Sequence, residues 1–166
     1  MKWLLALFAS MLLVACGGNP RTGEPVHYDF GSPGADGADW ALPLGSLEVQ
    51  AASWLAGPGM HYRLAYTEPL RRQSYAGSRW AAPPAELLEA LFKRRLAAAE
   101  PTAQGAGCRL QIALDEFEQR FDDVQNSQAL IEVRAQLLPA HGVDVVARRA
   151  FRSARVAATP DARGGA

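Results

Sequence analysis

The sequence has few residues that commonly form metal or catalytic centres. It contains only two cysteines and three histidines, His27, His61 and His141, which lie in separate segments. None of the histidines stands in an H-E-x-x-H motif, no pair of cysteines has metal-ligand spacing, and no serine lies in a G-x-S-x-G elbow. We therefore expect no metal, no cofactor and no catalytic residue. A tethered hydrolase, which would require a cleft of converging polar groups, is the enzymatic alternative.

Neither sign of charge is in excess. The chain has 17 Lys and Arg residues against 17 Asp and Glu residues, and its first 15 residues contain one base, Lys2, and no acid. A near-neutral chain is a poor match for nucleic acid, which attracts strongly basic surfaces. We therefore expect no nucleic-acid partner.

No hydrophobic run is long enough to cross a membrane. The longest, Trp3 to Ala15, has 13 residues, whereas a spanning helix needs about 20. A positive start followed by a run of about 7 to 15 apolar residues is typical of a secretory signal peptide. Residues 1–15 are therefore predicted to be a signal peptide.

The run ends in "LVAC", Leu13 to Cys16, which resembles the lipobox of bacterial lipoproteins. The resemblance implies cleavage before Cys16 and acylation of that residue. Because two or more acyl chains anchor a protein stably, whereas one gives marginal binding of about 10⁴ M⁻¹, Cys16 is the predicted lipid-attachment site. Gly17 in place of aspartate implies sorting to the outer membrane, on its periplasmic face. An ordinary secretory signal peptide with a chance cysteine is the alternative.

Cys108 would then be left without a partner cysteine. It opens the stretch "CRLQIAL", in which apolar residues alternate with other residues as in a half-buried strand. We interpret Cys108 as a small buried hydrophobe. An intermolecular disulfide or a reactive thiol is the alternative in an oxidising compartment.

Composition divides the remaining chain into three parts. Residues 16–45 are rich in Gly, Pro and Asp and are predicted to form a lipidated N-terminus and flexible tether, with a short strand at 26–30. Residues 46–155 are predicted to be a single folded domain. The tail, 156–166, is predicted to be disordered.

Apolar periodicity predicts a β-β-β-α-β-β-β order within the domain. Pro83 and Pro84 favour a helix start, and leucines and Phe92 then recur at helical spacing. A bulge is expected after Asp115, where the alternation of apolar residues changes phase. The predicted strands are 47–55, 60–66, 70–76, 108–121, 128–138 and 144–156, and the predicted helix starts at Pro83 and Pro84 and is stopped by Pro101.

The expected fold class is α/β, with a mixed, largely antiparallel sheet packed by one main helix. A single helix cannot cover both faces of such a sheet, so a partner subunit or another helix is expected on the exposed face. Trp80 lies between a strand and the helix start. We interpret it as filling that corner, with a partner-binding hot spot as the alternative.

The order of these segments resembles the ABC-type transport auxiliary lipoprotein family. The resemblance rests on the lipobox, on "YDFG", on "YAGSRWAAPPAELL" and on "LQIALDEFEQRF". Its firmest matches, which are also candidate partner contacts, are Tyr75, Arg79, Trp80 and Pro83. Leu87 and Leu88 match as well.

The resemblance implies a non-enzymatic protein that accompanies an intermembrane lipid-transport system made of an ABC transporter and MCE-domain proteins, of the paraquat-inducible type. It also implies possible assembly into a homo-oligomeric ring. Members usually continue into a C-terminal helix, whereas this sequence ends at Ala166, so we expect that helix to be missing and a sheet face to be exposed. A structural or assembly lipoprotein of another envelope complex is the alternative function.

Overall fold

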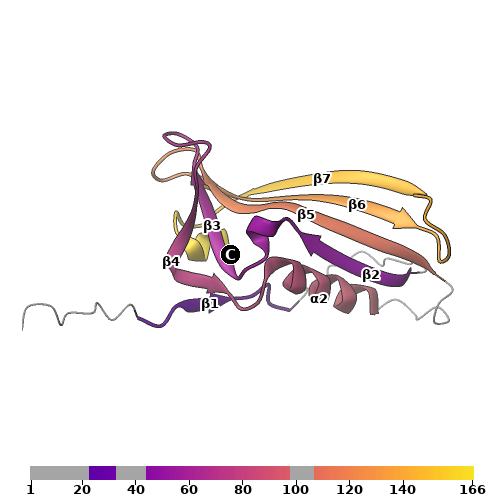
Figure 1. Cartoon of the computed structure of the whole chain (residues 1–166). Helices are drawn as coiled ribbons and strands as arrows, with labels where there is room; N and C mark the ends of the chain where they lie inside the picture. Colours follow the sequence, from indigo (N-terminus) through magenta and orange to yellow (C-terminus); the bar gives the residue numbers. More distant parts are fainter. Residues whose placement is uncertain (1–22, 33–43, 98–106) are drawn as a thin grey trace, which may run out of the picture.

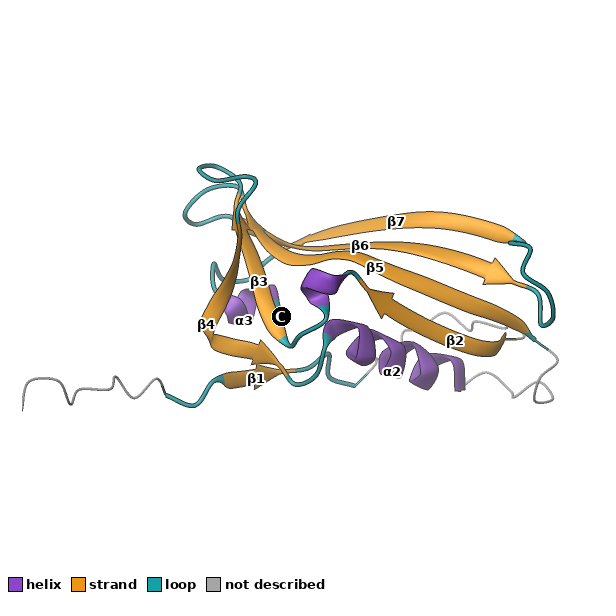
Figure 2. Cartoon of the chain, in the orientation of Figure 1, coloured by secondary structure: helices purple, strands orange, loops and turns teal. Residues whose placement is uncertain are grey.

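The computed structural model describes residues 23–32, 44–97 and 107–166, which form a single α/β domain with one seven-stranded mixed sheet (Figures 1 and 2). The signal peptide, Cys16 and most of the predicted tether lie outside these residues. In chain order the elements are β1 (Val26–Tyr28), β2 (Leu44–Ala51), the 3-10 turn η1 (Ser53–Leu55), β3 (Gly59–Leu64), β4 (Arg72–Trp80), α2 (Pro84–Ala97), β5 (Cys108–Phe121), β6 (Ser127–Leu138), β7 (Ala147–Val156) and α3 (Ala162–Gly165).

The strand β5 is the centre of the sheet. The first half of β5 pairs with β2 and its last three residues pair with β3, in both cases parallel. Its other edge carries the antiparallel β6, which in turn pairs antiparallel with β7. The register shifts between Leu114 and Glu116, which places the bulge where the change of phase predicted it. The strands beyond it, β3, β4 and β1, turn across one end of the molecule (Figure 1).

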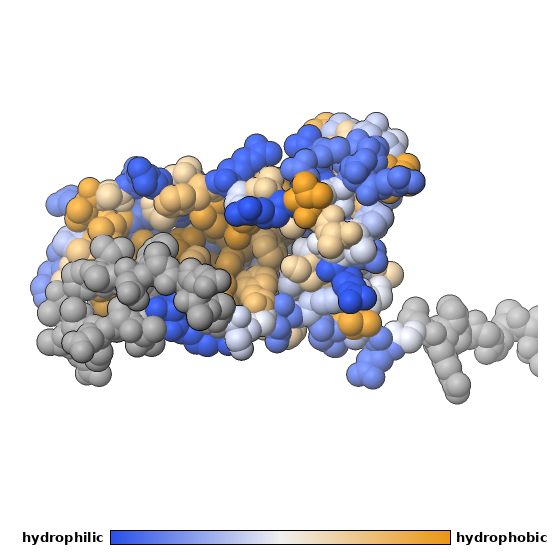
Figure 3. Space-filling view, turned by 180° about the vertical axis from the view of Figure 1, so that it is seen from behind, coloured by the Kyte–Doolittle hydropathy of each residue, from blue (hydrophilic) through white to orange (hydrophobic). Residues whose placement is uncertain are grey.

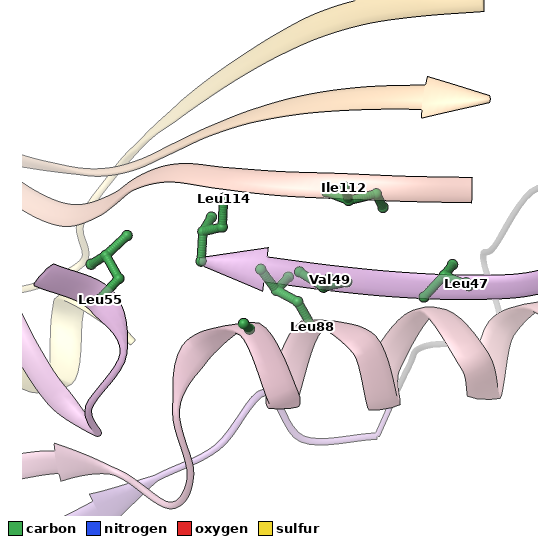
Figure 4. Packing of buried hydrophobic residues seen from close by; sticks show 7 residues of the cluster. Leu47, Val49, Leu55, Leu88, Ile112 and Leu114 are labelled. Carbon is green, nitrogen blue, oxygen red and sulfur yellow. The ribbon is translucent and has the colours of Figure 1, made fainter. Parts of the chain in front are cut away.

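The helix α2 packs beneath β2 and β5. Pro84 begins it, because the peptide N–H that proline lacks would have no partner in the first turn. Leu88 from the helix meets Val49 from β2 and Leu114 from β5 in the main core (Figure 4). The buried members of this core are Leu47, Val49, Leu55, Ala85, Leu88, Ile112 and Leu114.

The two faces of the sheet differ in character. We call the face on which α2 packs the inner face; there Ile131, Val133 and Ala135 of β6 lie against the core. The opposite, outer face is polar around Gln111, Arg134 and Gln136. Every residue of β7 is exposed, so the described chain leaves this end of the sheet uncovered, as expected for a sheet with one main helix.

The structure differs from two sequence predictions at the ends of the domain. Part of the predicted tether belongs to the fold, because β1 pairs with β4 and Phe30 packs against Trp80. The predicted disordered tail is also wrong, since residues 157–166 form an ordered turn and the single-turn helix α3, with Ala162 only 6% exposed. Neither segment has apolar periodicity, so their order comes from tertiary contacts.

Candidate binding site

The junction between β4 and α2 is built around three aromatic rings. Trp80, 4% exposed, lies 5.3 Å from Phe30 and 5.1 Å from Phe117, measured between ring centroids. The rings of Phe30 and Phe117 are themselves 5.6 Å apart at 73°, an edge-to-face arrangement. Edge-to-face pairs are the favoured geometry for aromatic quadrupoles. Three segments distant in sequence are therefore joined at Trp80.

Backbone hydrogen bonds fix the same corner. The N–H of Trp80 donates to the carbonyl of Pro58 at 2.8 Å, and the N–H of Ala81 donates to the carbonyl of Tyr28 at 2.7 Å. Two residues later the carbonyl of Pro83 accepts from Leu87 at 3.2 Å, which starts the helical ladder. These backbone hydrogen bonds hold the chain on both sides of the passage from strand to helix.

A pocket of about 140 Å³ opens beside these rings on the inner face. Its wall is apolar around Met60, Trp80, Phe117 and Ile131, and Arg155 of β7 lines it as well. A cavity of about 150 Å³ can hold a ring the size of benzene, whereas ordinary small-molecule sites occupy about 300–1,000 Å³. The pocket can therefore accept one side chain or the end of an acyl chain, but no larger ligand.

Gln119 of β5 connects the pocket to the C-terminal tail. Its side-chain oxygen accepts from the Tyr75 hydroxyl at 2.7 Å, and its amide nitrogen donates to Ser127 at 2.8 Å and to the Thr159 carbonyl at 3.3 Å. Since Gln119 is only 3% exposed, these partners satisfy polar atoms that burial would otherwise leave unpaired. Burial raises the pKa of Tyr75 well above its ordinary value, assisted by Tyr62 and Asp161, so the phenol stays a neutral donor.

The tail is fastened by a second set of contacts. Asp161 caps α3 by accepting from the N–H of Gly164 at 2.9 Å, and its carboxylate also accepts from Thr159 at 2.7 Å. A Cβ at Gly164 would overlap the backbone of Thr159, and one at Gly165 would overlap the side chain of Gln119. Two glycines are therefore needed for this close approach.

A charged cluster lies behind the pocket. Glu118, with a side chain 3% exposed, accepts from Arg63 at 2.9 Å, and Arg72 donates to Glu116 at 2.8 Å. The hydrogen bond to Glu118 raises the pKa of Arg63, so that the guanidinium stays charged. Such a buried pair offers paired charges and no free acid or base, which fits a structural role.

The arrangement nearest to a catalytic one is His61 beside Ser74. The hydroxyl of Ser74 lies 2.9 Å from Nδ1 of His61, and burial together with Arg72 lowers the pKa of the imidazole. Among the described residues no carboxylate forms a hydrogen bond or ion pair with His61. The orienting group of a nucleophilic triad is thus missing from this part of the chain.

The predicted site residues do not form one site. Tyr75 lines the pocket and Trp80 is buried beside it, the geometry expected of a corner-filling residue. Arg79 is exposed on β4, and Pro83 is half-buried before α2. Cys16 lies outside the described residues, whereas Cys108 is half-buried and forms no disulfide.

Sequence reasoning missed the two residues that link the pocket to its surroundings. Gln119 stands within the "DEFEQRF" stretch, and only the partners that the fold brings to it give it a role. Arg155 lies in an arginine-rich strand and lines the pocket. The sequence alone does not show which of these arginines faces the pocket and which faces solvent. An unusual signal was nevertheless present: four arginines and no acid in the ten residues of β7.

The inner face beyond α2 completes the candidate site. Phe151 of β7 stands opposite Val133 of β6 and is 50% exposed. Seen from behind, hydrophobic residues gather in the hollow of the molecule (Figure 3).

In the described ranges no group of three or more His, Cys, Asp and Glu side chains could hold a metal ion. No helix among those residues is long and apolar enough to span a membrane.

A family model and solved structures match this chain. A family model described as "ABC-type transport auxiliary lipoprotein component" matches residues 32–165. The structure is similar to the crystal structure of protein XCC0632 from Xanthomonas campestris, described as DUF330. The sequences are 25% identical with a TM-score of 0.66, over 86% of this chain and 80% of that chain.

A second crystal structure, described as an uncharacterized protein, is 16% identical with a TM-score of 0.63, over 86% of this chain and 87% of that one. At that identity the likeness shows the fold alone. No curated protein gives a significant match to this chain.

Proposed function

Because this chain belongs to the family of ABC-type transport auxiliary lipoprotein components, we propose that it is a non-enzymatic docking component of an intermembrane lipid-transport system. In this proposal the acyl chains on Cys16 hold it at the periplasmic face of the outer membrane. Its folded domain then contacts an MCE-domain protein that works with an ABC transporter.

The observation that carries the proposal is the open inner face. One helix covers β2 and β5, whereas Phe151 and the rest of β7 remain exposed beside an apolar pocket. Exposed apolar surface of this kind marks sites of interaction with proteins or membranes. A partner that covers this face would supply the layer that the domain does not provide for itself.

The size of the pocket favours docking over carriage of lipid. Its volume of about 140 Å³ is well below the roughly 300–1,000 Å³ of pockets that enclose a ligand. A protein that shuttled lipid molecules would need to bury far more of them. We therefore assign the domain a positioning role, in which the passage of lipid belongs to the partner.

Crosslinking with mass spectrometry on intact cell envelopes tests this function. We expect crosslinks from Lys93 or from the exposed carboxylates to an MCE-domain protein. Cys16→Ser serves as the matched control, because it removes the anchor and leaves the domain unchanged. Repeated capture of other envelope proteins, with no MCE-domain protein among them, would contradict the proposal and support the alternative, a structural or assembly lipoprotein of another complex.

A further inference from the structure

The strand β7 is a long sheet edge that the described chain leaves open. All ten of its residues are exposed, and its ladder with β6 runs from Val156 to Ala147 without a bulge. Most strands have about five or six residues, and proteins usually shorten, bulge or cover their edges because an open edge is a template for pairing. Within its ladder with β6, β7 shows none of these three devices. Its four arginines are a guard of another kind, because charged side chains limit which strands can pair with an edge.

The other edges of the sheet are shorter or are approached by another element. The free side of β2 is approached by α2, whose Glu89 accepts from the N–H of Val49 at 2.9 Å. The far edge of the sheet is formed by β1, which has only three residues, and by residues 72–77 of β4, which extend past β1 and pair with β3 on one side only. Both stretches are shorter than the ten residues of β7. The contrast singles out β7 as the edge on which a partner strand could lie along its full length.

The backbone groups of β7 alternate between the two edges. The N–H of Ala157 donates to the carbonyl of Ser127 at 2.9 Å, and hydrogen-bonded positions recur at every second residue of an antiparallel ladder. The odd-numbered residues of β7 therefore pair with β6. The even-numbered ones, including Ala150 and Ala154, direct their N–H and C=O groups to the open edge.

The charges on β7 are all of one sign and lie on both faces of the strand. Arg149 and Arg155 share the inner face with Phe151, whereas Arg148 and Arg152 point to the outer face. Arg152 pairs with Glu132 at 3.3 Å, and Arg149 lies over the ring of Phe151. Arg148 and Arg155 form no ion pair with the described residues.

We propose that β7 binds an extended acidic segment of a partner protein, which adds to the sheet as an eighth strand. An added strand presents its side chains alternately to the two faces, so acidic residues along it would meet arginines on both. Opposite charges across neighbouring strands stabilise the pairing, and main-chain hydrogen bonds supply the rest of the affinity. The proposal names the docking mode within the function proposed above and rests on that function only for the partner's identity.

Two other occupants fit the charges less well. A bilayer surface would meet arginines from one side, but those of β7 point to both faces of the sheet. A second copy paired through its own β7 would bring arginine strands together, and like charges on adjacent strands are destabilising. The three-residue β1 of a second copy could cover only part of the ten-residue edge.

Peptide binding to the full-length mature lipoprotein in a neutral detergent tests the proposal. The probe is a fluorescent ten-residue peptide in which pairs of glutamates alternate with pairs of β-branched residues. We expect its lysine analogue, and an analogue N-methylated at every second amide, to bind at least about tenfold more weakly. The N-methylated peptide keeps the charge and loses the main-chain donors. If that analogue bound as tightly as the unmodified acidic peptide, the proposal that the peptide adds to the sheet as a strand would be overturned.

Two variants of the protein complete the test. Ala154→Pro removes an N–H that faces the open edge and leaves the ladder with β6 intact, and Arg148→Glu with Arg155→Glu reverses one charge on each face. Each should weaken the acidic probe about tenfold or more without changing the melting temperature. The matched control, Arg71→Glu with Arg95→Glu, makes the same change of net charge away from β7 and should bind normally.

Three results would overturn the proposal. The first is undiminished binding by either β7 variant. The second is binding to anionic phosphatidylglycerol vesicles that the arginine reversals abolish and Ala154→Pro leaves intact, which would assign the arginines to lipid headgroups. The third is self-association that Ala154→Pro abolishes, which would assign the edge to a second copy. Because the assay contains no transporter, its failure leaves the transport function standing.

Discussion

Replacement of Trp80 by alanine should be among the most destabilising changes in the domain. Its side chain is 4% exposed and contacts both Phe30 and Phe117, so the substitution removes a large buried ring and leaves a cavity. Buried Trp→Ala or Phe→Ala changes cost about 3–5 kcal/mol, which is a large share of the roughly 5–15 kcal/mol of a whole domain. At about 4 °C per kcal/mol the melting temperature should fall by about 12–20 °C.

Thermal unfolding followed by circular dichroism measures the effect, and Trp54 provides a matched control. Trp54 is 54% exposed and has one cation–π contact, with Arg72 at 5.8 Å. Because an exposed contact of this kind contributes about 0.5–1 kcal/mol, Trp54→Ala should lower the melting temperature by only a few degrees. Denaturant titration of both proteins would give the free energies of unfolding independently.

Equal melting temperatures for the two variants would refute the structural role assigned to the aromatic junction. A Trp80→Ala protein that melts normally but loses its envelope crosslinks would instead identify Trp80 as a binding residue. The junction between β4 and α2 would then be stable without the indole ring, and the contacts of Trp80 with Phe30 and Phe117 would not account for the tryptophan at this position.

Three further predictions concern other parts of the molecule. Gly164→Ala should detach the tail, because its Cβ would overlap Thr159, and faster hydrogen exchange confined to residues 157–166 would show it; unchanged exchange would refute the contact. Burial lowers the pKa of His61 below 6.5, so the unfolded chain binds more protons there and stability should fall as the pH drops below about 6.5. His61→Gln should flatten that part of the stability profile, and an identical profile would contradict the assignment. Cys16→Ser should leave the signal peptide of residues 1–15 uncleaved and the protein without acyl chains, and a variant that mass spectrometry still shows to be cleaved and acylated would contradict the predicted lipid attachment.

The sequence predicted the elements that local chemistry determines. Pro84 starts α2 where the proline pair indicated, the register of β5 shifts beside Asp115, and the turn after β6 contains Gly142 at φ 103°. That φ is accessible to glycine without strain. Each of these features depends on the period of apolar residues or on one backbone preference, both of which can be seen along the chain.

The missed features depend on pairing across the fold. Nothing in the residues of β1 indicates a parallel partner about 50 positions away in β4, and the tail contributes one buried apolar side chain, Ala162. Gln119 is polar in a strand, where sequence patterns favour an exposed position; Tyr75, Ser127 and Thr159 bury it by satisfying its amide. The open edge of β7 likewise depends on which strands pair, and alternation of residues does not specify that.

Photo-crosslinking in living cells tests the central claim most directly, which is that the open inner face of the sheet meets the transport partner. A benzophenone amino acid replaces Phe151, which is 50% exposed on that face, or Gln111, which is exposed on the opposite face. We predict an adduct with an MCE-domain protein from position 151 and none from position 111. Adducts from both positions, or from position 111 alone, would contradict the assignment of the inner face.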